Sequence, residues 1–133
     1  MSALASSSVA MSALASSSVA RLALYNNASV TESILRGSSV AIAEMRKTAQ
    51  EVNATLNTSW QTLYAGKAFV IEIWESSTGN YQRTCGDYVV GSSTVVHRSN
   101  SSTTKLAVGK FASQVRHVWS TSTWTGYSLI FKI

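Results

Sequence analysis

Hydrophobic and polar residues alternate along the second half of the chain with the two-residue period of a β-strand. The clearest run is AFVIEIW (68–74), in which Phe69, Ile71 and Ile73 share one face. Turn-forming segments such as HRSNSSTT (97–104) separate the runs, and this arrangement is typical of a β-sandwich or barrel. Further strands are predicted within 81–90, with a break at Gly86, and at 93–96, 105–108, 114–119 and 128–133.

A helical pattern precedes the first of these strands. Hydrophobic residues recur about every 3.6 residues from Val30 onward, and Ser29 and Glu32 have the spacing of a capping box. Gly37 and the serines after it interrupt the run of good helix formers. The sequence therefore predicts a helix over 30–36, whereas 39–52 is compatible with either a helix or a strand.

The first twenty residues are the decapeptide MSALASSSVA written twice. A solenoid repeat is longer and degenerate, so an identical copy that begins with Met indicates a duplication introduced in sequence assembly or expression. Residues 1–20 are expected to be a loosely held Ser/Ala-rich segment unless something packs on Leu4, Val9, Leu14 and Val19. Residues 21–133 are predicted to be one domain, a mainly β protein with a β-sandwich on which an N-terminal α-helix packs.

The charge balance changes this picture only slightly. A net charge of +5 favours an anionic surface such as a membrane or acidic glycans, but names no partner. The basic residues are scattered, so nucleic acid is not expected as a partner. The single cysteine, Cys85, is interpreted as a small buried residue and excludes an internal disulfide framework. Asn-x-Ser/Thr sequons favour a secreted or extracellular protein, and they begin at Asn27, Asn53, Asn57 and Asn100.

Residues suited to catalysis are few. Glu72 and Glu75 lie three positions apart on a predicted strand, which places them on opposite faces and excludes a carboxylate pair. His97 and His117 occur in no HExxH motif and near no nucleophile elbow. We therefore expect no enzymatic activity, no metal site and no cofactor.

The aromatic residues near the C-terminus are the more informative set. In QVRHVWSTSTWTGY (114–127), Trp119, Trp124 and Tyr127 stand among serines and threonines. They are either core residues of a sheet or contact groups for a ligand, whereas Trp74, in an apolar strand, is predicted to be core. Exposed indoles beside hydroxyl groups suit sugar rings, and they also suit lipid headgroups, since a choline ammonium binds over a π face.

Three stretches resemble the actinoporins, pore-forming toxins of sea anemones whose β-sandwich is shared with fungal fruit-body lectins. The first is the start SALA with the later segment that ends in MRK (45–47), and the second is NTSWQTL (57–63). The third and most specific is KLAVGKFASQVRHVWSTSTW (105–124), with one additional residue between Val108 and Phe111. The chain differs from the toxins where tyrosines and a proline form their phosphocholine pocket, since Gln114, Val115, His117 and Ser120 stand there.

The resemblance implies a β-sandwich that binds glycans or cell-surface glycoconjugates as a lectin. On this hypothesis Trp119, Trp124 and Tyr127 stack on sugar rings, and Arg116, His117 and Asp87 are their polar partners. Agglutination of cells needs several sites per particle, so a homo-oligomer is expected.

Two alternatives stay open. The first is a membrane-binding, pore-forming cytolysin that contacts lipid headgroups. Its inserting segment would be 21–47, where each charge at the bilayer centre costs about 2.5–3.5 kcal/mol, so a helix docked on its own sandwich is the simpler interpretation. The second alternative is a structural or assembly protein with no small ligand.

Overall fold

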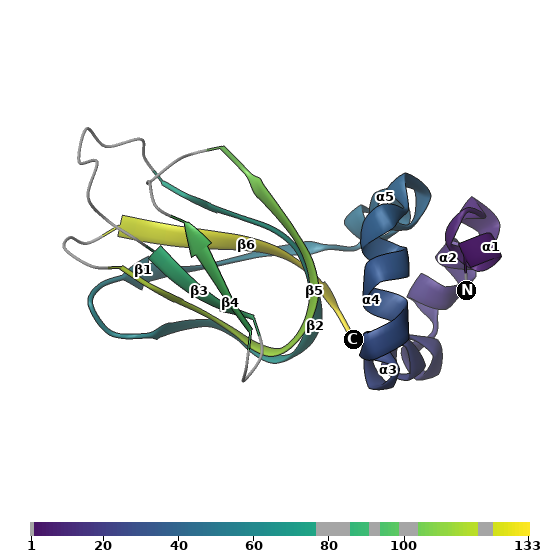
Figure 1. Cartoon of the computed structure of the whole chain (residues 1–133), viewed down its shortest axis with the longest axis horizontal. Helices are drawn as coiled ribbons and strands as arrows, with labels where there is room; N and C mark the ends of the chain where they lie inside the picture. The colour runs from purple at the N-terminus through teal and green to yellow at the C-terminus, as the bar shows by residue number, and fades with distance from the viewer. Residues whose placement is uncertain (1, 77–85, 91–93, 99–103, 120–123) are drawn as a thin grey trace.

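The computed structural model describes residues 2–76, 86–90, 94–98, 104–119 and 124–133, with the backbone alone for 86–90 and 94–98. Five helices come first in the chain: α1 (Ser2–Ala5), α2 (Ser8–Ser16), α3 (Ser18–Asn26), α4 (Ala28–Gly37) and α5 (Ser39–Arg46). Six strands follow: β1 (Gln50–Leu56), β2 (Gln61–Glu75), β3 (Gly86–Val90), β4 (Thr94–Arg98), β5 (Leu106–Val118) and β6 (Trp124–Lys132). The helices stand together at one end of the molecule, and the sheet extends away from them (Figure 1).

Three of the helices begin with the same tetrapeptide, Ser-Ser-Val-Ala. In each case the first serine is the N-cap, and its hydroxyl accepts the amide proton of the alanine three residues later (Ser7–Ala10 3.3 Å, Ser17–Ala20 3.2 Å, Ser38–Ala41 3.1 Å). Such a cap satisfies one of the amide groups that the first turn of a helix leaves without a partner. A short local sequence therefore starts a helix three times along the chain.

The duplicated decapeptide supplies two of these three starts, and its two copies lie in different environments. Residues 2–16 form helices instead of the loosely held segment that we expected, because Ala5 and Met11 are almost completely buried. Leu4, Val9 and Val19 are exposed, whereas Leu14 is partly buried against the helical core cluster, so the packing uses one of the four residues that the sequence suggested.

The predicted helix at 30–36 is confirmed as part of α4, but its predicted capping box is wrong. Asn27 is the N-cap and makes no side-chain cap bond, while Ser29 lies inside the helix. Glu32 does not return to Ser29. Its Oε2 accepts the backbone N–H of Phe111 at 3.0 Å, which ties α4 to β5.

The ambiguous stretch 39–52 contains both of the structures that its pattern allowed. Ser39–Arg46 is the helix α5, and the edge strand β1 begins at Gln50. The helix ends at Arg46, and residues 47–49 connect it to β1. The positive charges of Arg46 and Lys47 suit the C-terminal end of a helix.

The six strands form one sheet in the order β1-β6-β2-β5-β3-β4, and every described pair is antiparallel. The long strands β2 and β5 bend sharply, with register shifts near Tyr64, Ala68 and Glu72 (Figure 1). Gly109 allows one irregularity in β5, since it has φ 64° and the Arg36 side chain lies where a Cβ would stand. The predicted strands at 105–108 and 114–119 are therefore one continuous strand.

The fold class is only partly as predicted. An antiparallel sheet with N-terminal helical structure is present, but the single helix is replaced by five helices, and the described strands form one bent sheet. The five helices contain too many residues for the fold to be called mainly β, and the described chain is a mixed α and β structure.

The sheet has two faces with different cores. The outer face carries Phe69, Phe111 and Phe131, which pack against the helices in a cluster with Leu24, Leu35, Ala41 and Met45. The inner face, on the concave side, carries a second cluster with Val70, Ile73, Val108, Ala112, Val115 and Ile130. Since the sheet bends around its own inner face, only the outer face needs the helices as a cover.

Candidate functional site

Each of the four tryptophans lies at or near the end of a strand. Trp124 is aligned with Leu56 at the end of β1, and the backbone N–H of Trp119 donates to Asn57 O at 2.7 Å. Trp60 lies in the turn between β1 and β2, and Trp74 lies near the end of β2. The fold brings Trp119 and Trp124 into contact, whereas Trp74 packs on Tyr127 and Trp60 on Arg116.

Trp119 and His117 are inside the protein, so the prediction that they contact a ligand at the surface is not supported. Trp119 is 1% exposed and His117 has no exposed surface. Both lie on the inner face with Val115, and the side chains of His117 and Leu56 fill the space that a Cβ would need at Gly126. Alternation along β5 turns every second residue inward, and the bend of the sheet then covers it.

His117 and Ser128 form a buried polar pair. Their Nε2 and Oγ atoms are 3.1 Å apart, and neither residue has any exposed surface. Burial lowers the pKa of His117 to about 3, because the imidazolium form would lose its hydration. A nucleophile and its base must meet a substrate, so we assign this pair a structural role.

Trp124 is intermediate between the two alternatives that the sequence left open. It is half-buried, and its ring centroid is 6.0 Å from that of Trp119 with the planes tilted by 31°. Its alignment with the fully buried Leu56 places it at the mouth of the inner face. Trp124 thus belongs with the inner cluster of indoles and not with the residues of the outer surface.

Tyr127 lies on the outer face and stacks on Trp74. The two ring centroids are 5.4 Å apart and the planes differ by 4°, which is an offset parallel stack between neighbouring strands. The register aligns Tyr127 with Trp74 of β2 on one side and with the exposed Asn53 of β1 on the other. An aromatic and amide row therefore crosses three strands.

Hydroxyl groups border this row. The backbone N–H of Thr125 donates to Ser76 Oγ at 3.2 Å, and Thr55 is aligned with Thr125 across β1 and β6. No helix among the described residues packs on this part of the outer face. We call this surface the open face, and it comprises Asn53, Thr55, Trp74, Ser76, Thr125 and Tyr127.

An ion-pair cluster lies between the open face and the helix-covered part. Glu72 is aligned with Leu129 in the register of β2 and β6. Its carboxylate accepts hydrogen bonds from both Nη atoms of Arg46, at 3.0 and 2.7 Å. Lys105 Nζ is 3.4 Å from the same carboxylate and 4.4 Å from the ring centroid of Trp74. The hydrogen bonds from Arg46 lower the pKa of Glu72 below its ordinary value, so the carboxylate is ionised at neutral pH.

The remaining predicted site residues lie elsewhere. Arg116 is half-buried and its guanidinium is 5.5 Å from the ring centroid of Trp60, in a cation–π contact. Asp87 lies in β3, where its backbone is aligned with Val118 of β5, but its side chain is outside the described part of the chain. Cys85 and the sequon at Asn100 lie outside it as well.

Only Tyr127, of the six residues predicted to bind a ligand, belongs to the open face. The sequence analysis missed Asn53 and Lys105, and it assigned Trp74 to the core. That prediction is confirmed, because Trp74 is buried, with 9% of its surface exposed and with Tyr127 and Lys105 against its ring. The available signal was the alternation of β1, in which Asn53 and Thr55 share the polar face.

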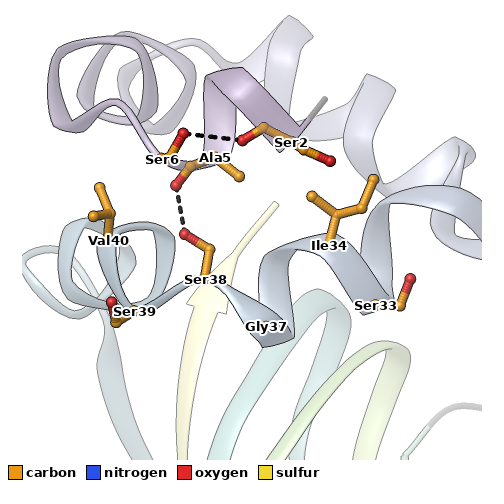
Figure 2. A pocket seen from close by; sticks show the side chains of 9 residues that line it. All are labelled: Ser2, Ala5, Ser6, Ser33, Ile34, Gly37, Ser38, Ser39 and Val40. Carbon is orange, nitrogen blue, oxygen red and sulfur yellow. Dashed lines mark hydrogen bonds between the residues drawn. The ribbon is translucent and has the colours of Figure 1, made fainter.

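Several hollows lie in the helical layer, and another lies between α3 and residues Lys67 and Ile133. One, of about 450 Å³, is lined by serines at the junction of α1, α4 and α5 (Figure 2). Ser38 Oγ donates to Ala5 O there and Ser6 Oγ donates to Ser2 O at 3.2 Å, so two of the hydroxyls hold α1 in place. The lining contains no charged or aromatic side chain and offers little to a ligand.

Two further findings concern chemistry that the site could support. Within the described ranges, no three His, Cys, Asp or Glu side chains come together as a metal would require. None of the described helices has the length and apolar character needed to cross a membrane.

Comparison of the chain with protein-family models, with curated proteins and with solved structures finds no match. The site must therefore be interpreted from its own geometry.

Proposed function

We propose that this protein is a non-enzymatic, carbohydrate-binding lectin and that its open face holds the sugar. The stacked pair of Trp74 and Tyr127 is the observation on which the proposal rests. Trp74 is buried and supports the half-buried ring of Tyr127, which offers apolar contact to the C–H groups of a pyranose, while nearby amides and hydroxyls bond to its hydroxyl groups. Asn53, Thr55 and Thr125 supply those polar groups beside the rings.

The aromatic pair is also suitably rigid. Tyr127 is fixed on one side by Trp74, whose own second face is occupied by the Lys105 ammonium. The opposite side of Tyr127 is turned towards Asn53 by the register of β6 and β1. Preorganised rings lose little conformational freedom when a ligand binds, which favours affinity at a small site.

The finer assignment of fold is part of the same proposal. We infer an actinoporin-like sheet related to the fungal fruit-body lectins, supported by the resemblance in 105–124 and by the helices at one flank of the sheet. A single small site binds weakly, so agglutination would require a homo-oligomer acting on cell-surface glycoconjugates outside the cell.

A second candidate function is binding to a membrane surface, the first step of a cytolysin. It is favoured by exposed apolar side chains in the helical layer, among them Val9 at 80%, Val19 at 79% and Val30 at 58%. No acidic residue precedes Glu32 in the sequence, so this layer would not be repelled by anionic lipid. Release of dye from phosphatidylcholine and sphingomyelin vesicles would support this candidate over the lectin.

The lectin proposal is tested by agglutination of red cells and by direct glycan binding. We expect Tyr127→Ala to weaken binding about tenfold, whereas Tyr127→Phe, which keeps the stack, retains most of it. Trp60→Ala is the matched control, since it removes an exposed indole that contacts Arg116 and lies outside the open face.

Two results would count against this assignment, and a third would only show unfolding. Agglutination that no soluble sugar inhibits would remove the lectin function altogether. Loss of binding in Trp60→Ala with normal binding in Tyr127→Ala would move the site to Trp60 and Arg116. Loss of binding in all variants together with a lower melting temperature would show unfolding, which circular dichroism detects separately.

A further inference from the structure

The buried carboxylate of Glu72 holds two cations at the border of the open face. Its side chain is 8% exposed, while those of Arg46 and Lys105 are 43% and 53% exposed. Both cations therefore keep surface for a second partner. One carboxylate between two cations leaves the cluster with one unit of positive charge.

The two cations are not equivalent. Arg46 makes a bidentate ion pair with Glu72, in which two N–H groups meet two oxygens at 3.0 and 2.7 Å. Lys105 makes a longer contact of 3.4 Å with one of those oxygens. Since Arg46 already satisfies the carboxylate with better geometry, the ammonium of Lys105 is the group that remains available to a ligand.

Lys105 is also the cation next to the aromatic row. Its Nζ is 4.4 Å from the centroid of Trp74, and Trp74 stacks on Tyr127. Trp74 lies between Tyr127 on the β6 side and Lys105 on the β5 side, so the ammonium stands at the β5 end of the row. The hydrogen bonds from Arg46 keep the pKa of Glu72 low, so the cluster holds its charge at neutral pH.

An exposed carboxylate stands at the β1 end of the neighbouring row. Glu51 is exposed on β1, and the register places it across Leu129 from Glu72 on the same face. A ligand with a negative group would therefore bind with that group towards β5 and away from β1. The surface around the open face is therefore positively charged near β5 and negatively charged near β1.

We propose that the sugar bound by the open face is an anionic pyranose, whose carboxylate or sulfate group is met by Lys105. This inference rests on the lectin function proposed above and names its ligand class. Lys105 acts as a specificity-determining residue: it selects for the charged group, while the aromatic and hydroxyl groups bind the ring. The net charge of +5 on the whole chain adds a general attraction in the same sense.

The experiment uses the full chain and an array of matched glycans, in which each neutral hexose oligosaccharide is printed beside its uronic acid and its sulfate ester. We expect the wild-type protein to bind the anionic member of a pair about fivefold better, the factor typical of a solvent-exposed ion pair. High salt reduces this preference, since it screens exposed charges. The uronic acid and sulfate arms show which anion is preferred.

Lys105→Gln should bring the ratio of anionic to neutral binding close to one, and this ratio is the readout because any change in the aromatic pair affects both members of a glycan pair alike. Lys67→Gln is the matched control, because Lys67 Nζ lies 5.0 Å from the Tyr25 ring and is likewise exposed, but stands beside the helices. It removes the same charge from the chain, and the ratio should not change.

The outcomes separate the two proposals. Equal binding of neutral and anionic sugars by the wild type overturns the role of Lys105 and leaves the lectin function intact. An equal loss of preference in Lys67→Gln attributes it to net charge and also overturns that role. Absence of binding to every sugar on the array overturns both.

Discussion

The outer face of the sheet is divided into two halves built from the same strands. In one half Phe69, Phe111 and Phe131 are aligned side by side and covered by helices. In the other half Trp74 and Tyr127 are aligned in the same way, with Asn53 next to them, and no described helix covers them. Both halves present aromatic rings from adjacent strands at the same spacing.

The difference between the halves comes from the length of the helical layer. The last helix ends at Arg46, and that side chain reaches Glu72 at the border between the halves. Up to this border the rings are covered by helices, and beyond it the ring of Tyr127 is half-buried with no described helix over it. An aromatic ring on a strand thus acquires its role from what lies over it and not from the strand that carries it.

The largest expected effect is on the covered half. Phe111→Ala removes a ring that makes edge contacts with Phe69 at 5.0 Å and Tyr25 at 5.7 Å, and should lower the free energy of unfolding by about 3–5 kcal/mol. Tyr127→Ala in the open half should cost only about 1 kcal/mol, mainly the lost stack. Urea unfolding of both variants measures the difference, and equal losses would contradict the division into halves.

The next effect concerns the inner face and its dependence on pH. His117 is neutral in the folded state because burial lowers its pKa to about 3, while the unfolded chain binds the proton near pH 6.5. Stability is therefore complete above pH 6.5 and falls as the pH is lowered towards 3, by about 3 kcal/mol between pH 7 and pH 4.

The control for this effect is His117→Gln, which retains a polar group beside Ser128 but does not titrate. Unfolding measured across the interval from pH 6.5 to pH 4.5 should lose most of its slope in this variant. Over most of that interval Glu72, whose pKa is lowered in the folded state, is ionised in both states, and it contributes little until the unfolded carboxyl begins to bind protons near the lower end. An unchanged slope would assign the acid sensitivity to another group.

The smallest expected effect is on the helices that form the cover. Ser17→Ala removes one N-cap hydroxyl and should cost about 1 kcal/mol. Ser38→Ala should cost more, since the same hydroxyl also donates to Ala5 O and fixes α1 (Figure 2). Thermal unfolding followed by circular dichroism at 222 nm compares the two, and a larger loss in Ser17→Ala would argue against that second role.

Local patterns in the sequence determined most of the strands and one helix. The alternation at 68–74 is confirmed within β2, and the apolar spacing at 30–36 is confirmed within α4. These elements were predictable because their periodicity is a property of neighbouring residues. The helix starts at Ser7, Ser17 and Ser38 were equally local, but the identity of the two decapeptides led to an interpretation as an artefact.

Only the tertiary structure decided which aromatic rings are buried. Trp119 and Trp124 stand among similar serines and threonines in the sequence, yet Trp119 is enclosed because the sheet bends around its inner face. Trp74 and Tyr127 are 53 positions apart in the sequence and meet through the register of β2 and β6. Bends, registers and the extent of the helical cover are long-range contacts, and a pattern of neighbouring residues does not contain them.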